Sequence, residues 1–259
     1  MKKIIKVAII LILSIYIIFG FILFIFQKKF VYYPDNQNFN YCDGFKDSQK
    51  ININGTKAYY KKNSEKLVVF YHGNAGSACA RSFLKDEFEK QGLSYIFVEY
   101  SGYSADTKRP SKELLMKNVE NINQFIKSQN FSEVAIAGES LGTSLAVYHS
   151  SIANTDKLLL ISPFYSMLDI AKVNYGMYPV SLMLTENYDS SEWMKNSQTK
   201  DVEIIHGSAD DIVPINQSKM LFNEVPTANK KFVEVLGAHH NDIYNFKETY
   251  INIDTFLNK

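Results

Sequence analysis

Three kinds of hydrophobic pattern divide this chain: one unbroken apolar run near its amino terminus, short apolar runs of strand length, and amphipathic stretches of helix length. The unbroken run extends from Val7 to Phe26, and only Ser14 and Gly20 within it lie outside the hydrophobic set. A helix of this length rises about 30 Å, which matches the hydrocarbon core of a bilayer. The pattern therefore predicts an N-terminal transmembrane anchor over residues 1–27.

A cleaved signal peptide is the competing interpretation of this run. Signal peptides have an apolar region of roughly 7–15 residues and a small-residue cleavage site. Here the run is longer and continues into FIFQKKFVYYP, which is bulky and basic and has no A-x-A pattern. Three lysines precede the run and two follow it, so the positive-inside rule favours, by a small margin, a cytoplasmic amino terminus. The sequence thus predicts a single-pass signal anchor with the rest of the chain on the extracytoplasmic, periplasmic side.

Strand-like and helix-like patterns alternate after a predicted linker at residues 28–46. Asn54-Gly55 supplies the positive φ values of a tight hairpin turn. Ser111 is a predicted N-cap, because an amphipathic run follows it directly. The predicted strands are residues 66–71, 93–100, 133–138, 157–162, 202–206 and 231–236, and the predicted helices are residues 77–91, 111–129, 141–152 and 242–256.

Repeated alternation of helices with nearly continuous apolar strands is typical of a parallel sheet covered by helices on both faces. We therefore predict an α/β fold with a mostly parallel central sheet, formed by one domain at residues 47–259. Residues 163–201 interrupt the alternation, are rich in Met, Tyr and Leu, and contain Trp193, the only tryptophan. This segment is predicted to be a small cap over the carboxyl edge of the sheet.

Composition and charge exclude several classes of protein. With 259 residues, 46% of them hydrophobic, the chain can bury a core and is not intrinsically disordered. A formal net charge of +1 indicates no nucleic-acid partner. No His, Asp or Cys group has metal-ligand spacing such as H-E-x-x-H, so neither a metal nor a cofactor is expected. Cys42 and Cys79 form a disulfide in an oxidising compartment or remain free thiols, and the sequence leaves both open.

A candidate nucleophile lies in the sequence GESLG at residues 138–142, which fits G-x-S-x-G. A predicted strand precedes this motif and a predicted helix follows it, as a nucleophile elbow requires. Gly138 and Gly142 suit that turn, because it is too tight for a Cβ on either side of the serine. The pattern therefore predicts that Ser140 is a nucleophile with its Oγ held above the sheet.

A serine hydroxyl needs a base to accept its proton, and the base needs an orienting carboxylate. Behind a nucleophile elbow these follow in the order acid and then histidine. The sequences HGSADDIVP (206–214) and GAHHND (237–242) supply both residue types after two later strands. Because the carboxyl ends of parallel strands meet at one edge of the sheet, we expect them to converge near Ser140.

An oxyanion site is predicted at HGNAG (72–76), directly after the first core strand. Its small residues allow main-chain N–H groups to face the elbow. The N–H groups of Asn74 and Leu141 are the predicted oxyanion donors. A phosphate-binding loop is the alternative use of such a turn, although neither G-x-x-x-x-G-K-[ST] nor G-x-G-x-x-G is present.

With these motifs the sequence resembles the α/β-hydrolase superfamily, and within it small membrane-anchored hydrolases related to abhydrolase-domain and serine aminopeptidase-like proteins. The resemblance covers residues 28 to 258 and also includes FVYYP, EYSGYS and SPFYSMLDIAK. It implies that the acid of H-G-x-x-D-x-x-V-P is Asp210 and that the base of G-x-x-H-N-D is His240. Many relatives carry glycine in place of His239, so His239 stays an alternative base.

The remaining polar candidates have structural interpretations. His206 is expected to hydrogen-bond the loop after its strand, and His149 is expected to be structural within its helix. The main chain of His72 is expected to matter more than its ring. Asp242 is a predicted N-cap of the last helix, and Asp211 is expected to be solvated.

The resemblance implies a membrane-anchored serine hydrolase that cleaves carboxylic ester or thioester bonds through a Ser140–His240–Asp210 triad and an acyl-enzyme. A cap this short favours an open pocket, and therefore small acyl ester, thioester or lipid-like substrates over peptides. One alternative is a peptide or amide hydrolase of the serine aminopeptidase type. The other is a non-catalytic, membrane-tethered binding protein on a hydrolase scaffold.

Overall fold

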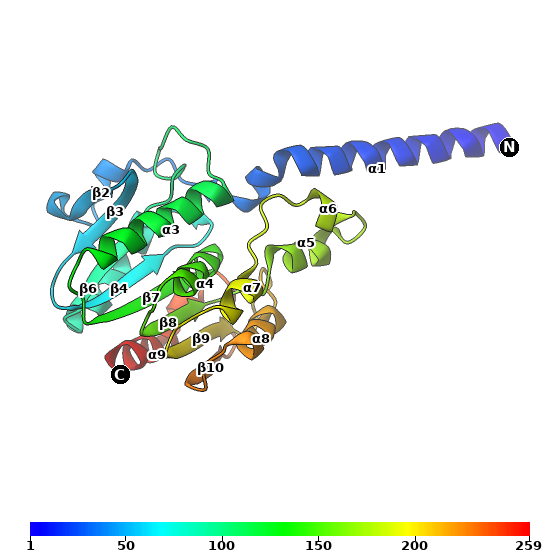
Figure 1. The fold of residues 1–259 in the computed structure, drawn as a ribbon. Coiled ribbons are helices and arrows are strands. Elements are labelled where there is room, and N and C mark those ends of the chain that lie inside the picture. The colour runs from blue at the N-terminus through cyan, green and yellow to red at the C-terminus, as the bar shows by residue number, and fades with distance from the viewer.

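A computed structural model describes all residues, 1–259. Its centre is an eight-stranded sheet of order β10-β9-β8-β7-β4-β6-β3-β2 (Figure 1). The strands from β10 to β6 in this order pair in parallel, and β3 and β2 continue the sheet antiparallel, so the predicted mostly parallel sheet is confirmed. The strands are β2 (Lys50–Ile53), β3 (Thr56–Lys61), β4 (Lys66–Tyr71), β6 (Ser94–Val98), β7 (Glu133–Glu139), β8 (Lys157–Ile161), β9 (Asp201–Gly207) and β10 (Lys230–Val235).

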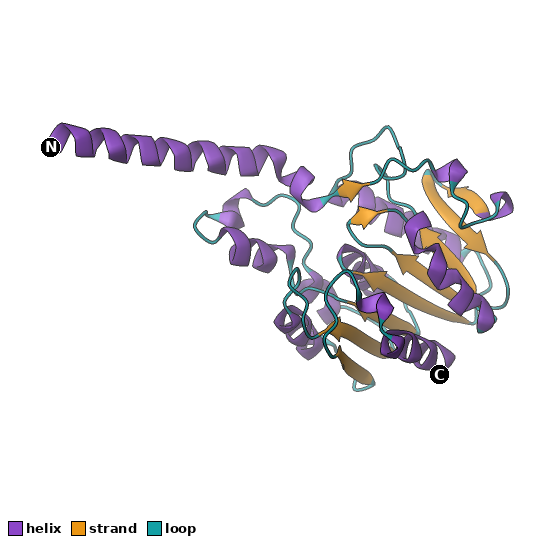
Figure 2. Ribbon diagram, turned by 180° about the vertical axis from the view of Figure 1, so that it is seen from behind, coloured by secondary structure: helices purple, strands orange, loops and turns teal.

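Helices cover both faces of this sheet (Figure 2). Successive residues of β4 point to opposite faces, so Val69 and Tyr71 join one hydrophobic cluster and Val68 and Phe70 join another. The first cluster includes residues of α3 (Lys112–Lys127), α4 (Leu141–Ile152) and α8 (Ile215–Glu224). The second includes residues of α2 (Lys85–Lys90) and α9 (Lys247–Asn258).

Local sequence signals predicted most of these strands, helices and turns correctly. Asn54 and Gly55 have φ values of 51° and 89°, as the predicted hairpin turn requires. The Ser111 side chain accepts a hydrogen bond from the Leu114 N–H and caps α3 as predicted. The prediction that Asp242 caps the last helix is wrong, because its Oδ1 accepts the His239 N–H at 2.6 Å and α9 begins only at Lys247. Short 3₁₀ turns precede α2 and α9, namely η3 (Cys79–Leu84) and η4 (Ile243–Asn245).

The predicted cap segment divides into two parts. Its last helix, α7 (Ser190–Lys195), packs on α4, where Met194 is buried in the core. Its first two helices, α5 (Met167–Tyr175) and α6 (Val180–Met183), project from the body of the domain toward α1 (Figure 1). Only α5 and α6 therefore stand apart from the sheet and its covering helices.

The apolar run forms a single helix, α1 (Lys2–Val31), most of which extends away from the domain (Figures 1 and 2). The helix continues past residue 27, and the segment 28–46 differs from the expected linker because it packs on the domain. Its apolar side chains enter both core clusters: Val31, Tyr32, Phe39, Cys42 and Phe45. This segment also contains the turn η1 (Phe39–Tyr41) and β1 (Tyr33–Pro34), which pairs in parallel with β5 (Ala75–Gly76); the turn η2 (Asp47–Gln49) follows it directly.

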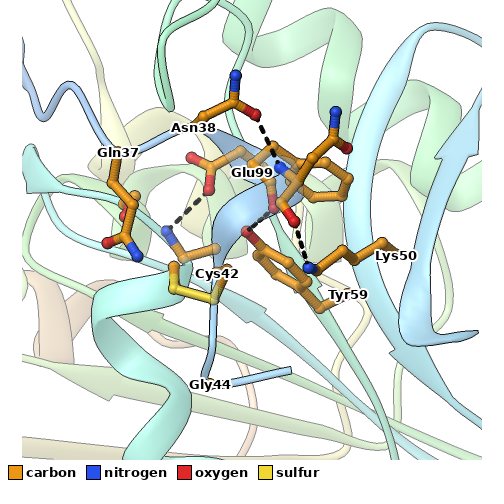
Figure 3. The surroundings of a disulfide bond; sticks show 12 residues. Gln37, Asn38, Cys42, Gly44, Lys50, Tyr59 and Glu99 are labelled. Atoms are coloured by element: carbon orange, nitrogen blue, oxygen red, sulfur yellow. Dashed lines mark hydrogen bonds between the residues drawn. A yellow bond between two sulfur atoms is a disulfide. The ribbon is translucent and has the colours of Figure 1, made fainter. Parts of the chain in front are cut away.

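A disulfide joins Cys42 to Cys79, with a Cα–Cα separation of 5.9 Å (Figure 3). The same stretch of chain is attached to the sheet by two further contacts in Figure 3. The Tyr59 hydroxyl donates to the Phe39 carbonyl at 3.3 Å, and the Lys50 ammonium donates to the Asn40 carbonyl at 2.6 Å. The pairing that the sequence left open is therefore formed, and it holds the segment after α1 against the domain.

His149 is structural, as expected, and its burial makes the free energy of unfolding depend on pH in the acid range. Its Nδ1 hydrogen-bonds the Tyr71 hydroxyl at 2.9 Å, and burial, with a smaller contribution from Lys127, lowers its pKa to about 3. The unfolded chain therefore binds this proton below pH of about 6.5, whereas the folded chain does not. Stability is lost as pH falls from about 6.5 toward 3, by about 1.4 kcal/mol per pH unit from this group. We expect His149→Gln to flatten this part of the stability–pH curve in denaturant titrations; an unchanged slope would contradict the assignment.

Candidate active site

The predicted elbow places Ser140 in a strained backbone conformation between β7 and α4. Ser140 has φ 50° and ψ −117°, which a non-glycine residue rarely adopts. A Cβ on Gly138 would overlap the main chain of Gly142, and a Cβ on Gly142 would overlap the main-chain oxygen of Tyr71. The two glycines are therefore required by close approach of the backbone, and the turn presents the serine side chain above the sheet.

His240 lies between Ser140 and Asp210 at the carboxyl edge of the sheet. Its Nε2 is 2.9 Å from Ser140 Oγ, and its Nδ1 is 2.7 Å from Asp210 Oδ2. Asp210 follows β9 and His240 follows β10, so two separate loops deliver them. The structure thus brings together the three side chains that the sequence analysis named as nucleophile, base and acid.

The Asp210 carboxylate is held in its charged form. Burial alone would raise its pKa, but hydrogen bonds from His206 and His240, with the Val213 N–H, hold the pKa well below its usual range. Its Oδ1 accepts the N–H groups of Ile212 at 3.0 Å and Val213 at 2.7 Å. A charged Asp210 favours the proton on His240 Nδ1, which leaves the Nε2 lone pair directed at the serine.

His206 lies 3.2 Å from Asp210 and contacts the loop that follows β9. Its Nε2 hydrogen-bonds the Val213 carbonyl at 2.9 Å, so the predicted contact between His206 and the following loop is confirmed. Its Nδ1 hydrogen-bonds the Ser218 hydroxyl of α8. Side chains of β9 and α8 therefore fix the position of the acid.

His239 does not reach Ser140 or Asp210. Its Nδ1 is 3.7 Å from Asp211, and the two side chains are 56% and 75% exposed. Asp211 is solvated, as expected. The adjacent pairs His239–His240 and Asp210–Asp211 are thus separated by geometry, with one member of each directed into the site and the other into solvent.

The predicted oxyanion turn lies directly against the elbow. A Cβ added to Gly73 would be 3.6 Å from the Ser140 Cβ and 2.8 Å from Glu139 Oε1, so the absence of a side chain allows this approach. The N–H of Asn74 donates to no other group of the chain. Leu141 is the first residue of α4, so its N–H has no acceptor one turn earlier in the helix. Both predicted donors are therefore available to a ligand.

Groups from α1, from β1 and from the EYSGYS sequence hold this turn in place. The Asn74 carbonyl accepts the Tyr33 N–H at 3.0 Å and the Tyr103 hydroxyl at 2.8 Å. The Asn74 side chain donates to the Val31 carbonyl at 3.2 Å, and the Tyr100 hydroxyl donates to the His72 carbonyl at 2.6 Å. The last turn of α1 is thus bonded directly to the candidate oxyanion site.

Sequence reasoning missed an ion pair immediately behind the nucleophile. Arg81 makes two hydrogen bonds to the Glu139 carboxylate, at 2.6 and 2.7 Å, and the Tyr244 hydroxyl adds a third at 3.2 Å. Burial would raise the pKa of Glu139, but the Arg81 bonds lower it. Glu139 precedes Ser140 in the elbow motif, yet nothing in the sequence around Arg81 indicates this partner.

No group of three or more His, Cys, Asp or Glu side chains in the chain is arranged to hold a metal ion. The polar side chains at the site are the ones described above. Together with the two free N–H groups, they can deprotonate a hydroxyl and receive a negatively charged oxygen next to it.

Comparison with known proteins gives remote relatives. An uncharacterized protein of Mycobacterium tuberculosis is 32% identical over 178 residues, covering 68% of this chain and 63% of that protein. An uncharacterized membrane protein of Saccharomyces cerevisiae is 25% identical over 189 residues, covering 70% of this chain and 66% of that protein. The chain thus matches less than two thirds of the length of these relatives. No protein-family model matches it.

Solved structures are similar over most of the chain. The monoacylglycerol lipase of Paleococcus ferrophilus superimposes with a TM-score of 0.62, covering 78% of this chain and 98% of that one, at 17% identity. The mostly parallel sheet, the strained serine turn after β7 and the loops after β9 and β10 match the arrangement expected from the sequence resemblance. This chain therefore has the α/β-hydrolase fold.

Proposed function

We propose that this protein is a membrane-anchored serine hydrolase that cleaves carboxylic ester or thioester bonds. The observation that carries the proposal is the hydrogen-bonded series from Ser140 Oγ through His240 to Asp210, at 2.9 and 2.7 Å. The N–H groups of Asn74 and Leu141, which donate to no group of the chain, support the proposal as the oxyanion donors. A protein that only binds its ligand does not require a strained serine hydrogen-bonded to a histidine that a carboxylate orients.

The reaction proceeds through an acyl-enzyme. Ser140 Oγ attacks the substrate carbonyl carbon while its proton passes to His240 Nε2, and Asp210 stabilises the imidazolium. The N–H groups of Asn74 and Leu141 bind the oxyanion. Collapse breaks the bond to the alcohol or thiol, which leaves with the proton from His240. Water then attacks the acyl-enzyme by the reverse proton path, which releases the carboxylic acid and restores Ser140.

The short cap and the type of structural relative favour esters and thioesters as substrates. Only α5 and α6 project over this side of the domain, so no large cap domain encloses a deep chamber. The solved relative named above is, by its title, a monoacylglycerol lipase. An open active site therefore favours an extended acyl substrate over a peptide whose terminus must be enclosed in a chamber.

Several observations support an uncleaved anchor with the domain outside the cytoplasm. The α1 helix has a mean hydropathy of 3.1 over its most apolar window, of which 6% is buried. Its Tyr16 hydroxyl donates to the Met177 carbonyl at 2.6 Å, so α1 packs on the rest of the chain. This packing supports a helix that stays attached, because a signal peptide is removed from the mature protein. The yeast relative carries the name of a membrane protein. The Cys42–Cys79 disulfide fits an oxidising compartment.

Labelling with a fluorophosphonate probe tests this function. The probe reacts with a serine only when a base activates it, so we expect labelling of the wild type and none of Ser140→Ala. Ser151→Ala is the matched control and should label like the wild type. Ser151 lies near the C-terminal end of α4, the helix that begins directly after Ser140. Equal labelling of Ser140→Ala and the wild type would overturn the proposal.

A further inference from the structure

One face of α1 is bound to the projecting part of the cap. The Tyr178 ring stacks on Tyr16, with centroids 4.5 Å apart, and the Tyr16 hydroxyl donates to the Met177 carbonyl at 2.6 Å. A Cβ on Gly20 would come within 2.8 Å of the Tyr178 ring, so only glycine allows this packing. Positions 16 and 20 lie one turn apart on the same face of the helix.

The same face carries a second attachment near the end of α1. Gln27 Oε1 accepts the N–H groups of Thr185 at 2.7 Å and Glu186 at 3.3 Å, and its Nε2 donates to the Met183 carbonyl at 3.2 Å. Tyr16 and Gln27 are separated by a helical rise of about 16 Å. The cap is therefore fastened to α1 at two points with a length of helix between them.

A cavity of about 370 Å³ lies between the cap and the last turns of α1, on either side of Gln27, and 13 of its 16 lining residues are hydrophobic. Leu23, Phe24 and Phe30 of α1 form one wall, and Ile170 and Ala171 of α5 contribute to the opposite wall. This volume is within the range of small-molecule sites. Helix α1 is thus a wall of an apolar cavity, in addition to any role as an anchor.

Two residues that line the cavity are hydrogen-bonded to residues of the candidate active site. Val31 lines it, and the Val31 carbonyl accepts a hydrogen bond from the side chain of Asn74. Ile212 also lines it, and its N–H donates to Asp210 at 3.0 Å. One boundary of the cavity is therefore bonded to the oxyanion turn and another to the loop of the acid.

The outer surface around the cavity is apolar as well. Val173, Met177 and Leu182 are 69%, 73% and 85% exposed at the tip of the cap. Met177, whose carbonyl accepts the Tyr16 hydroxyl, adjoins the part of α1 that is expected to lie in the bilayer. Exposed apolar side chains beside such a segment mark a membrane contact. With α1 in the bilayer, the tip of the cap lies at the level of the hydrocarbon.

We propose that this cavity binds the long acyl chain of a membrane lipid ester, which enters sideways from the bilayer between α1 and the helices α5 and α6. The inference rests on the proposed hydrolase function and its anchor. A hydrocarbon chain needs no hydrogen-bond partners, whereas a peptide in this cavity would leave backbone groups unsatisfied. The ester carbonyl then lies at Ser140, and α1 forms part of the substrate site.

Filling the cavity tests the proposal through chain-length preference. In the full chain, reconstituted in phospholipid nanodiscs, we expect Ala171→Trp to lower the ratio of kcat/KM for p-nitrophenyl palmitate to that for p-nitrophenyl acetate by about tenfold or more. That is the loss expected when roughly two methylene groups no longer fit. Val173→Trp, on the exposed face of the same helix, should leave the ratio unchanged. An unchanged ratio in Ala171→Trp, or an equal fall in both variants, would overturn the inference.

Photo-crosslinking tests the cavity without using catalysis. Full-length Ser140→Ala in nanodiscs is irradiated with a monoacylglycerol that carries a diazirine on its acyl chain, and the labelled peptides are mapped by mass spectrometry. Labelling of α5, lost in Ser140→Ala/Ala171→Trp, supports the proposal. Labelling confined to the lipid-exposed faces of α1 contradicts it. If wild-type enzyme fails to cleave p-nitrophenyl acetate, the hydrolase function fails, while this measurement still decides the cavity.

Discussion

Replacing His240 with alanine is expected to lower kcat for p-nitrophenyl acetate by about 10⁴-fold, whereas His239→Ala should change it by less than about twofold. His240 Nε2 is 2.9 Å from Ser140 Oγ and its Nδ1 contacts a buried carboxylate, so its loss removes the proton acceptor. The His239 side chain is 56% exposed, and its Nδ1 lies 3.7 Å from Asp211. The two residues are adjacent in the chain, so they form a matched pair.

Steady-state kinetics on the two purified variants provides the measurement, with circular dichroism to show that both are folded. The contrast between the variants is the informative quantity, because a general loss of stability would affect both. A large loss in His239→Ala with little loss in His240→Ala would show that the exposed histidine is the base and that the observed hydrogen bonds do not describe the reacting enzyme.

Removing the disulfide with Cys42→Ser and Cys79→Ser is expected to lower the free energy of unfolding by about 4 kcal/mol. The two cysteines are 37 residues apart in the chain. Closing a loop of this length lowers the entropy of the unfolded chain, which raises its free energy by about 4 kcal/mol at 25 °C. Chemical denaturation of the full chain in detergent measures the difference, and reduction of the wild type with a phosphine should reproduce it. A change below about 1 kcal/mol in both experiments would show that packing alone holds residues 28–46.

The disulfide also bears on the active site through its position. It joins the segment that follows α1 to η3, which begins three residues after the turn that contains Asn74. The same segment pairs with that turn through β1 and β5. Reduction is therefore expected to affect the geometry of the oxyanion turn as well as global stability, which the kinetics of the cysteine variants would record.

The strands and helices of the hydrolase domain were predictable because their signals are local. The apolar run 66–71 is six residues of strand-forming side chains, and β4 has the same bounds. The segment 28–46 was not predictable in this way. Its polar and turn-forming residues resemble those of a linker. Its aromatic side chains Phe39 and Phe45 become core residues because the chain packs them into the second hydrophobic cluster.

The candidate site separates in the same manner. The GESLG turn depends on the backbone conformation of five neighbouring residues, so its sequence is sufficient to indicate it. The contact between Arg81 and Glu139 joins residues 58 positions apart, and no pattern around either residue indicates the other. The cavity between α1 and the cap is likewise formed by distant segments, because α1 ends at Val31 and α5 begins only at Met167.

The sequence by itself determined the alternation of strands and helices, the long apolar helix, the strained serine turn and the order of acid and histidine after it. These features depend on side-chain period and on φ and ψ preferences within a few residues. Only the tertiary structure decided that His240 and not His239 faces Ser140, that Cys42 meets Cys79, and that α1 forms a wall of a cavity. Such contacts depend on where distant segments meet, and that is set by the packing of the whole domain.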